Sequence, residues 1–373
     1  MQIENLAKRI GVSRLADVTG LDRVGLPVVA AIRPLSRNLT VSFGKGLTRE
    51  TALISAVMEA AELYFSEHPP GRLVHANFGE LKRGAAIDPA KLERIEPGDI
   101  SRRKFSWVEA HLLDSDRPIL VPWEIVSMDY SVEARQEKRV LSFGATGLAA
   151  DFVEGRAVLH GLHEVIERDA HNSWNRASDE YRAQTLVDLR TVRSPDVLSL
   201  LDRVDTANLE LLLWDITGKT GVPCYIAEVF DVASSTPTAF VQGTAADLSP
   251  AIAIIKAISE ALQVRLTYIA GSRDDLEWSD YGSRYDHVVA NRYWVKNNLT
   301  ARRKVPAPEA EFFTNELALA ELMRRLEMMG CRQVVVVRLN GDEDSVKVVK
   351  VIVPSFADVQ EVEDLRPAES VAS

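Results

Sequence analysis

Three segments of the sequence share one pattern, and that pattern constrains the fold more than any other feature. They lie at about residues 49–68, 153–172 and 249–270, and each has apolar residues at helical spacing with acids on the opposite face. At 100° per residue, Glu59 and Glu62 fall on one arc of the first segment, facing away from its apolar side chains. A helix of this kind buries its apolar face against another layer of secondary structure. The chain therefore has to place three such helices against strands or other helices.

The polar arcs of these predicted helices are rich in oxygen ligands, because each contains an acid–x–x–acid or acid–x–x–amide step. Their members are Ser55, Glu59, Glu62 and Ser66; Arg156, His160, Glu164, Glu167 and His171; and Lys256, Glu260, Gln263 and Thr267. Adjacent carboxylates repel one another, and Mg²⁺ suits such oxygen sets, often together with nucleotide phosphates. For one helix alone a solvated face explains the arc better. Three such helices favour a magnesium–nucleotide site.

Strand-like runs alternate with these helices along the chain. They cover about residues 24–33, 39–43, 209–216, 222–230, 238–243, 333–338 and 346–353. Further helices are predicted at about 187–204 and 316–329, and a polar strand-and-loop stretch runs to about residue 142. Because no linker-like segment interrupts the chain, we predict an α+β fold with mixed β-sheets and flanking helices, a single compact unit over 1–373. Its last residues, 356–373, are predicted to be a flexible tail.

Composition excludes several classes of function. Lys and Arg number 44 against 54 Asp and Glu, and the net charge of −10 argues against nonspecific nucleic-acid binding. Two cysteines, Cys224 and Cys331, cannot form a disulfide framework or a four-thiolate zinc site. No apolar run reaches the roughly 20 residues of a membrane span. We expect a cytoplasmic protein that binds neither nucleic acid nor membrane.

Common nucleotide and metal motifs are absent. SFGKGLT lacks the first glycine and the Ser/Thr of a Walker loop, no GxGxxG follows a strand, and HEVIERDAH is not HExxH. Lys45, between the two glycines, fits a phosphate ligand and a solvated turn lysine equally well.

Four blocks of the sequence, in fixed order over about residues 15–355, resemble the YcaO family. They are TGLDRVGLPVVAAIRP with GKGLTRETALISAVMEAAELYFSE, ATGLAADFVEGRAVLHGLHEVIERDA, VQGTAADLSPAIAIIKAISEALQVRLTYIAGSRDD, and KVVKVIVPSFAD. The resemblance implies a YcaO-like fold and an ATP- and Mg²⁺-dependent enzyme that activates a backbone amide of a ribosomally made precursor peptide by phosphorylation. It also implies a homodimer.

The resemblance also implies roles for individual residues. Around Mg²⁺ and the ATP phosphates it places Ser55, Glu59, Glu62, Glu164, Glu167, Glu260 and Gln263. In our hypothesis the five glutamates of this set bind the metal, and Arg156, Lys256 and Arg265 offset negative charge. Glu164, Glu167 and Arg265 are the predicted catalytic residues, although the helical wheel puts Arg265 off the Glu260 arc.

Two features bear on the subtype. The chain ends in RPAESVAS rather than the Pro-rich tail of many cyclodehydrating members, and MEAAELYFSEH is similar to members that act with TfuA proteins. The resemblance therefore implies thioamide formation with a TfuA-like partner. Thr146, Phe152 and Arg156 depart from the family pattern, which has Asn, an amide and an acid there. Asp151 or Glu154 could replace the lost ligands.

Three alternatives stay open at this point. The first is an azoline-forming cyclodehydratase component. The second is a degenerate relative that binds peptide without turning over ATP, which the departures at Phe152 and Arg156 favour. The third is a carboxylate-bridged di-metal helix bundle, suggested by His160, Glu164, Glu167 and His171. The chain is nevertheless rich in strands, and these segments lack Glu-x-x-His.

Overall fold

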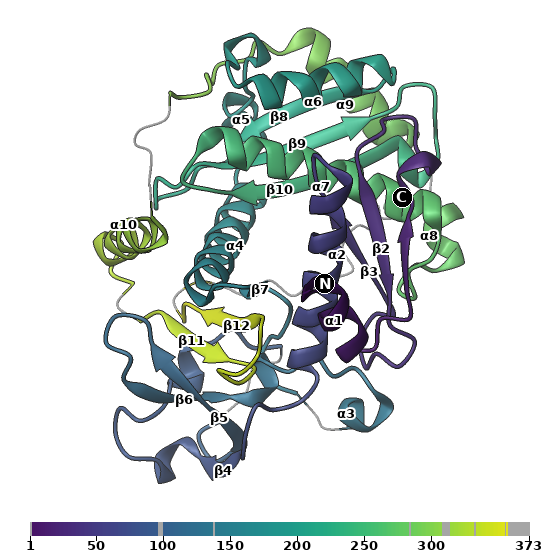
Figure 1. The fold of residues 1–373 in the computed structure, drawn as a ribbon. Helices are drawn as coiled ribbons and strands as arrows, with labels where there is room; N and C mark the ends of the chain where they lie inside the picture. Colours follow the sequence, from purple (N-terminus) through teal and green to yellow (C-terminus); the bar gives the residue numbers. More distant parts are fainter. Residues whose placement is uncertain are drawn as a thin grey trace, which may run out of the picture.

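The computed structural model describes residues 2–95, 100–136, 139–282, 285–307, 314–331, 333–354 and 356. Three antiparallel sheets organise this part of the chain (Figure 1). The first sheet has the order β1 (Arg14–Asp17), β2 (Val28–Ile32), β3 (Val41–Lys45). The second has the order β10 (Phe240–Ala246), β9 (Cys224–Phe230), β8 (Glu210–Asp215). The third has the order β4 (Val74–Asn77), β5 (Lys104–Leu112), β11 (Val335–Arg338), β12 (Lys347–Ile352), β7 (Leu148–Asp151), with β6 (Pro118–Pro122) also on β5.

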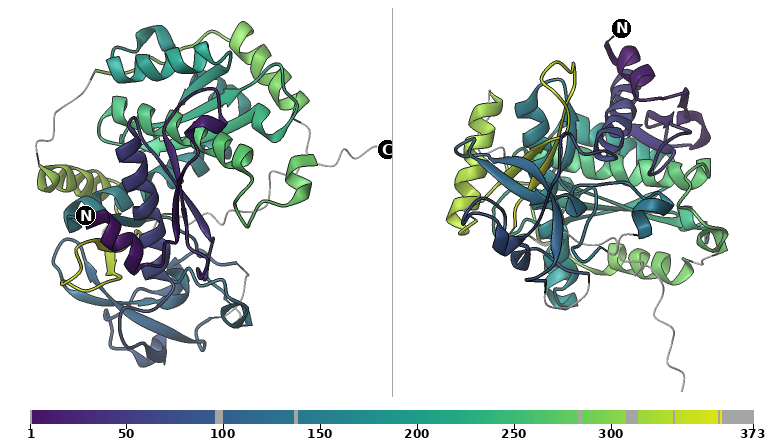
Figure 2. Two further views of the ribbon diagram at one scale, coloured as in Figure 1. Left: turned by 45° about the vertical axis from the view of Figure 1, so that its right-hand side comes forward. Right: turned by 90° about the horizontal axis from the view of Figure 1, so that it is seen from below.

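Ten α-helices occur among the described residues. They are α1 (Gln2–Arg9), α2 (Arg49–Ser66), α3 (Val132–Gln136), α4 (Glu154–Asn175), α5 (Asp179–Gln184), α6 (Pro195–Thr206), α7 (Pro250–Ala270), α8 (Trp278–Gly282), α9 (Asp286–Asn298) and α10 (Asn315–Met328). Helix α1 packs against α2 (Figure 2). None of the described helices is long and apolar enough to cross a membrane.

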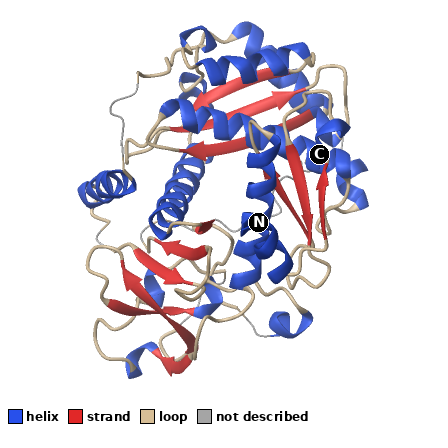
Figure 3. Ribbon diagram, viewed as in Figure 1, coloured by secondary structure: helices blue, strands red, loops and turns tan. Residues whose placement is uncertain are grey.

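The three acidic helices connect the three sheets. Helix α2 contacts β2 and β3 of the first sheet and β7 and β12 of the third. Helix α4 contacts β7 and β12 and, at its other side, β9 and β10 of the second sheet. Helix α7 contacts β9 and β10 and also β3 of the first sheet. Each acidic helix therefore bridges a different pair of sheets, and the three surround the centre of the molecule (Figure 3).

Local sequence explains where these helices begin. The Thr48 side chain accepts a hydrogen bond from the Thr51 amide and forms a capping box with it, which starts α2. Ser249 caps α7, Pro250 occupies its first turn, and Gly271 ends the helix at a φ of 56°.

Two glycines let strands approach helices closely. A Cβ on Gly44 of β3 would lie 1.9 Å from the Ala56 nitrogen of α2. A Cβ on Gly243 of β10 would lie 2.3 Å from the Ala261 nitrogen of α7. Real side-chain atoms do not tolerate such distances, so only glycine permits these contacts. They fix the positions of the two helices that carry Glu59 and Glu260.

The predicted fold class is confirmed, with several sheets and flanking helices. The helix predicted over 187–204 is wrong in its first half: only α6, from Pro195, is an α-helix, because a residue before proline is disfavoured from helical geometry. The strand predicted to stop at Phe43 continues through Lys45, with Gly44 inside it. Apart from Phe356, the predicted flexible tail lies outside the described residues.

Candidate functional site

The acids predicted to bind metal come together from α2, α4 and α7. Glu62 interacts electrostatically with Glu59 on its own helix and with Glu164 on α4. The third helix joins through Glu260, whose negative charge acts on Glu59 and Glu167. Five carboxylates from three separated segments therefore form one electrostatic cluster, which we call the carboxylate cluster: Glu59, Glu62, Glu164, Glu167 and Glu260.

The cluster is largely shielded from solvent but not sealed. The side chains of Glu164, Glu167 and Glu260 are 21%, 11% and 32% exposed. Desolvation is the first cause of the raised pKa of Glu59 and Glu164, and the pKa values of Glu62 and Glu167 are raised well above the ordinary value. Burial and mutual repulsion thus raise these pKa values more than the nearby positive charges lower them. An added cation would relieve this cost.

Backbone amides fix two of the carboxylates. The Ala150 amide in β7 donates to Glu62 Oε1 at 2.8 Å, and the Gly147 amide donates to Glu164 Oε2 at 3.1 Å. Strand β7 and the turn before it therefore orient acids on two different helices, so these side chains do not depend on helix geometry alone.

Several cations act on the cluster. Lys45 Nζ lies 3.8 Å from Glu260, and Arg168 lies 3.9 Å from both Glu164 and Glu167. The ammonium of Lys350 acts on Glu164, and the guanidinium of Arg273 acts on Glu59. The sequence left the role of Lys45 open, and it missed the other three. Lys350 had a visible signal, since it interrupts the apolar run of KVVKVIVP.

The cluster fits Mg²⁺ bound together with phosphates rather than a closed protein cage. Within the described ranges, no three His, Cys, Asp or Glu residues form a ready metal-binding group. Mg²⁺ commonly takes one or two carboxylates from the protein and completes its octahedral shell with phosphate oxygens and water. Each acid of the cluster has a raised pKa or a cationic neighbour. Such carboxylates suit a Mg²⁺ ion that is bound together with phosphates.

Gln263 and Ser55 lie on the same helices as the acids. Both are partly buried, and the Gln263 Oε1 atom is buried with no hydrogen-bond partner among the described residues. An unsatisfied buried acceptor costs free energy, so this atom is suited to accept a bond from a ligand or water.

Three predicted cationic ligands have partners outside the carboxylate cluster. Arg156 lies 2.7 Å from Asp151, and Lys256 lies 2.8 Å from Asp247. Arg265 is 5% exposed; its Nε lies 3.1 Å from Asp22, and the same guanidinium donates to the Thr238 carbonyl. These contacts describe Arg265 as part of a buried structural pair, and they give no support to the catalytic role predicted for it.

The departures from the family pattern have structural explanations. Phe152 packs against an apolar core, and Arg156 neutralises Asp151. Glu154 pairs with Arg338 at 2.8 Å. Both proposed replacement ligands, Asp151 and Glu154, are thus engaged with arginines.

Two histidines on α4 are neutral at physiological pH. Burial lowers the pKa of His160 to about 3 and that of His171 to about 4, with Lys256 and Arg168 as the next causes. Neither is therefore poised to exchange protons near pH 7.

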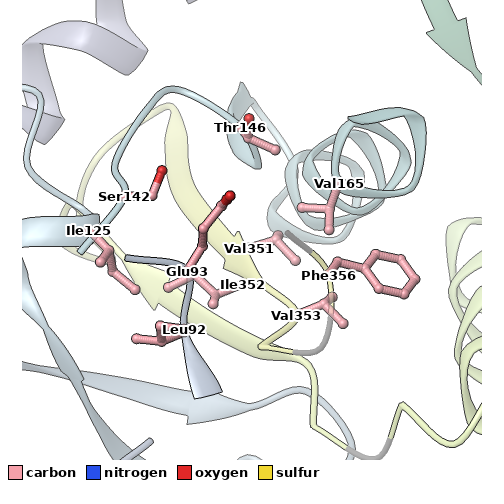
Figure 4. A pocket seen from close by; sticks show the side chains of 10 residues that line it. All are labelled: Leu92, Glu93, Ile125, Ser142, Thr146, Val165, Val351, Ile352, Val353 and Phe356. Carbon is pink, nitrogen blue, oxygen red and sulfur yellow. The ribbon is translucent and has the colours of Figure 1, made fainter. Parts of the chain in front are cut away.

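A small pocket lies beside α4, and Val165 of that helix is one of its lining residues (Figure 4). Val165, Val351 and Phe356 give it an apolar wall, and Thr146 adds a hydroxyl. Thr146, one of the departures, thus lines this pocket beside the Gly147 turn.

Comparison with known proteins identifies the family. A family model described as "YcaO cyclodehydratase, ATP-ad Mg2+-binding" matches residues 43–357. The chain belongs to the YcaO family. Among curated relatives, an uncharacterised protein in the tfuA 3′ region of Rhizobium leguminosarum bv. trifolii is 32% identical over 357 residues, covering 93% of this chain and 84% of that protein. An uncharacterised protein of Methanothermobacter thermautotrophicus is 32% identical over 355 residues, covering 93% and 90%.

Solved YcaO structures share the fold. YcaO from Methanopyrus kandleri, bound with AMPPCP and Mg²⁺, superposes with a TM-score of 0.71 at 23% identity, covering 96% of this chain and 92% of that one. A heterocyclase in complex with substrate and cofactor gives a TM-score of 0.72 at 19% identity; this chain spans about half of it, 52%. The family and fold predictions are confirmed, and ATP with Mg²⁺ is confirmed as the cofactor pair by the description of the family. The roles of individual residues stay predictions.

Proposed function

We propose that this YcaO protein uses ATP and Mg²⁺ to activate a backbone amide of a precursor peptide by phosphorylation. The observation that carries the proposal is the convergence of five carboxylates from α2, α4 and α7, with raised pKa values, in a chain of an ATP- and Mg²⁺-binding family.

We assign each residue of the proposed site a role according to where it lies. Glu59, Glu62, Glu164, Glu167 and Glu260 would hold Mg²⁺, which supplies neutralisation of the phosphate charge when bound. Lys45 and Arg168 lie at the same cluster and add positive charge where a triphosphate would meet the carboxylates. Ser55 and Gln263 offer neutral oxygen ligands from α2 and α7. Arg156 and Lys256 can reach phosphate only by sharing or leaving Asp151 and Asp247.

We favour thioamide formation as the specific reaction. Sulfide adds to the amide carbon, the oxygen of that adduct takes the terminal phosphoryl group of ATP, and phosphate leaves with this oxygen. The amide carbon is left doubly bonded to sulfur, with no net change of oxidation state. The name of the Rhizobium relative supports this choice and supports a TfuA-like partner protein. A homodimer also belongs to this proposal.

Phosphate release tests the proposed function. The wild type should release phosphate from Mg²⁺·ATP in the presence of a candidate precursor peptide, sulfide and TfuA-like protein. Glu164→Ala should lower this rate by about 10²-fold or more, since it removes charge from the cluster. Glu50→Gln, an exposed acid in the first turn of α2, is the matched control and should behave as wild type.

Mass spectrometry of the peptide separates the reactions. A gain in mass of one sulfur minus one oxygen supports thioamidation, whereas loss of water at a cysteine or serine indicates an azoline. The contrary result is a folded protein that binds the peptide and yet releases no phosphate under any condition. That result would contradict the proposed enzymatic activity and support the non-catalytic alternative.

A further inference from the structure

Lys350 of the third sheet is a fully buried lysine. Lys350 lies in the middle of β12, between Val349 and Val351, and its exposure is 0%. A fully buried lysine is rare, because removing an ammonium group from water costs several kcal/mol unless the group is paired. An apolar residue would fill a strand of this kind without that cost. The side chain must therefore be compensated by specific contacts.

Those contacts lead to the turn before β7. The Lys350 ammonium donates a hydrogen bond to the Gly144 carbonyl. The next residue on β12, Val351, donates its amide to the Gly147 carbonyl at 2.8 Å. Lys350 itself pairs in register with Leu148, the first residue of β7. Both ends of the 144–147 turn are therefore tied to β12, one by a side chain and one by the backbone.

The same turn holds a carboxylate of the proposed site. Gly147 adopts a φ of 80°, and its amide donates to Glu164 Oε2 at 3.1 Å. A Cβ on Gly147 would lie 2.2 Å from the Val351 carbonyl oxygen. On the other side, a Cβ on Gly161 of α4 would lie 2.7 Å from the Gly147 carbonyl oxygen. The turn is thus wedged between β12 and α4, and a shift of the turn moves the donor to Glu164.

We propose that Lys350 is a positioning residue, which anchors the 144–147 turn and thereby fixes the Glu164 carboxylate for Mg²⁺·nucleotide binding. Its ammonium also acts electrostatically on Glu164 across the buried interface. The consequence for nucleotide binding rests on the proposed function, whereas the consequence for the turn does not. Lys350 acts through the turn, and Glu164 is the group that meets the ligand.

Two measurements on Lys350→Met test this inference. In hydrogen exchange, the amides of residues 144–148 should exchange about tenfold faster than in wild type, while β10 and α7 stay unchanged. In calorimetry, binding of AMPPCP with Mg²⁺ should weaken by about tenfold, a size typical of lost support behind a metal ligand. Lys347→Met is the matched control: it lies on the same strand, but its ammonium donates to Gly341 and Asp342 at the far hairpin, and it should match wild type in both assays.

A double substitution separates positioning from general stability. In a Glu164→Gln background, adding Lys350→Met should not weaken binding further, because the group that Lys350 positions has already lost its charge. Additive losses would overturn the proposal, as would wild-type exchange at residues 144–148. If Lys350→Met does not fold, Lys350→Leu decides, since it removes both the donor and the charge; wild-type values in both assays would again overturn the proposal.

If the proposed nucleotide-dependent function is wrong, the outcome differs from the one that would contradict the role of Lys350. A wild type that binds no Mg²⁺·AMPPCP contradicts the nucleotide site itself. Hydrogen exchange at residues 144–148 still decides whether Lys350 anchors the turn.

Discussion

Glu62 shows how a carboxylate of the proposed site can lower the stability of the protein without ligand. Desolvation and the negative charges of Glu59 and Glu164 raise its pKa well above the ordinary value. A native carboxyl with a raised pKa binds a proton that the unfolded chain has already lost. Stability is therefore lost as pH rises from the unfolded Glu pKa of about 4.3 through the higher native pKa.

We expect Glu62→Gln to stabilise the protein without ligand at pH 7 to 8. The amide removes the buried charge and still accepts the hydrogen bond from Ala150. The gain should be roughly 1 kcal/mol, about 2 °C in Tm for a protein of this size, and should shrink toward pH 4. Thermal unfolding across pH measures it. A Tm below that of wild type at pH 8 would show that Glu62 is not under this electrostatic cost.

The elements position the acids through contacts that only small residues allow. We expect Gly44→Ala to destabilise the protein by about 1–3 kcal/mol, because the added methyl group collides with the Ala56 backbone and forces β3 and α2 apart. Urea unfolding measures the change. Gly71→Ala is the control, since a Cβ there meets open space. Equal midpoints for both variants would mean that the β3–α2 contact is not tight in solution.

At the scale of the whole molecule, the proposed site exists only where three sheets are joined. Helices α2, α4 and α7 each bridge a different pair of sheets, and each contributes at least one acid to the carboxylate cluster. A ligand bound there should restrain all three helices together.

We therefore expect Mg²⁺·AMPPCP to slow hydrogen exchange in α2, α4 and α7 at once and to raise the Tm. Ligand at a hundred times its Kd adds about 2.7 kcal/mol of stability. Chelation of Mg²⁺ with EDTA should remove most of both effects, because the uncompensated acids then repel the triphosphate. Protection limited to one helix, or an equal effect without Mg²⁺, would contradict a shared site.

Several features could be predicted from the sequence by itself. The acidic arcs at Glu59 and Glu62, Glu164 and Glu167, and Glu260 follow from a period of 3.6 residues, and capping residues set the starts of α2 and α7. These are local properties, determined by neighbours a few positions away. The resemblance to the YcaO family could also be predicted, because each motif block is a short run of residues that is recognised from the sequence alone.

Only the tertiary structure decided which polar residues share a site. Arg265 follows the acidic step of α7 in sequence, yet it turns to Asp22, 243 positions away. Lys350 interrupts an apolar run in the sequence, yet its ammonium donates to the Gly144 carbonyl at the start of the turn whose Gly147 amide bonds Glu164. Helical periodicity gives the direction of a side chain around its own axis, whereas its partner depends on which sheet packs against that face, and such long-range packing leaves no period in the sequence.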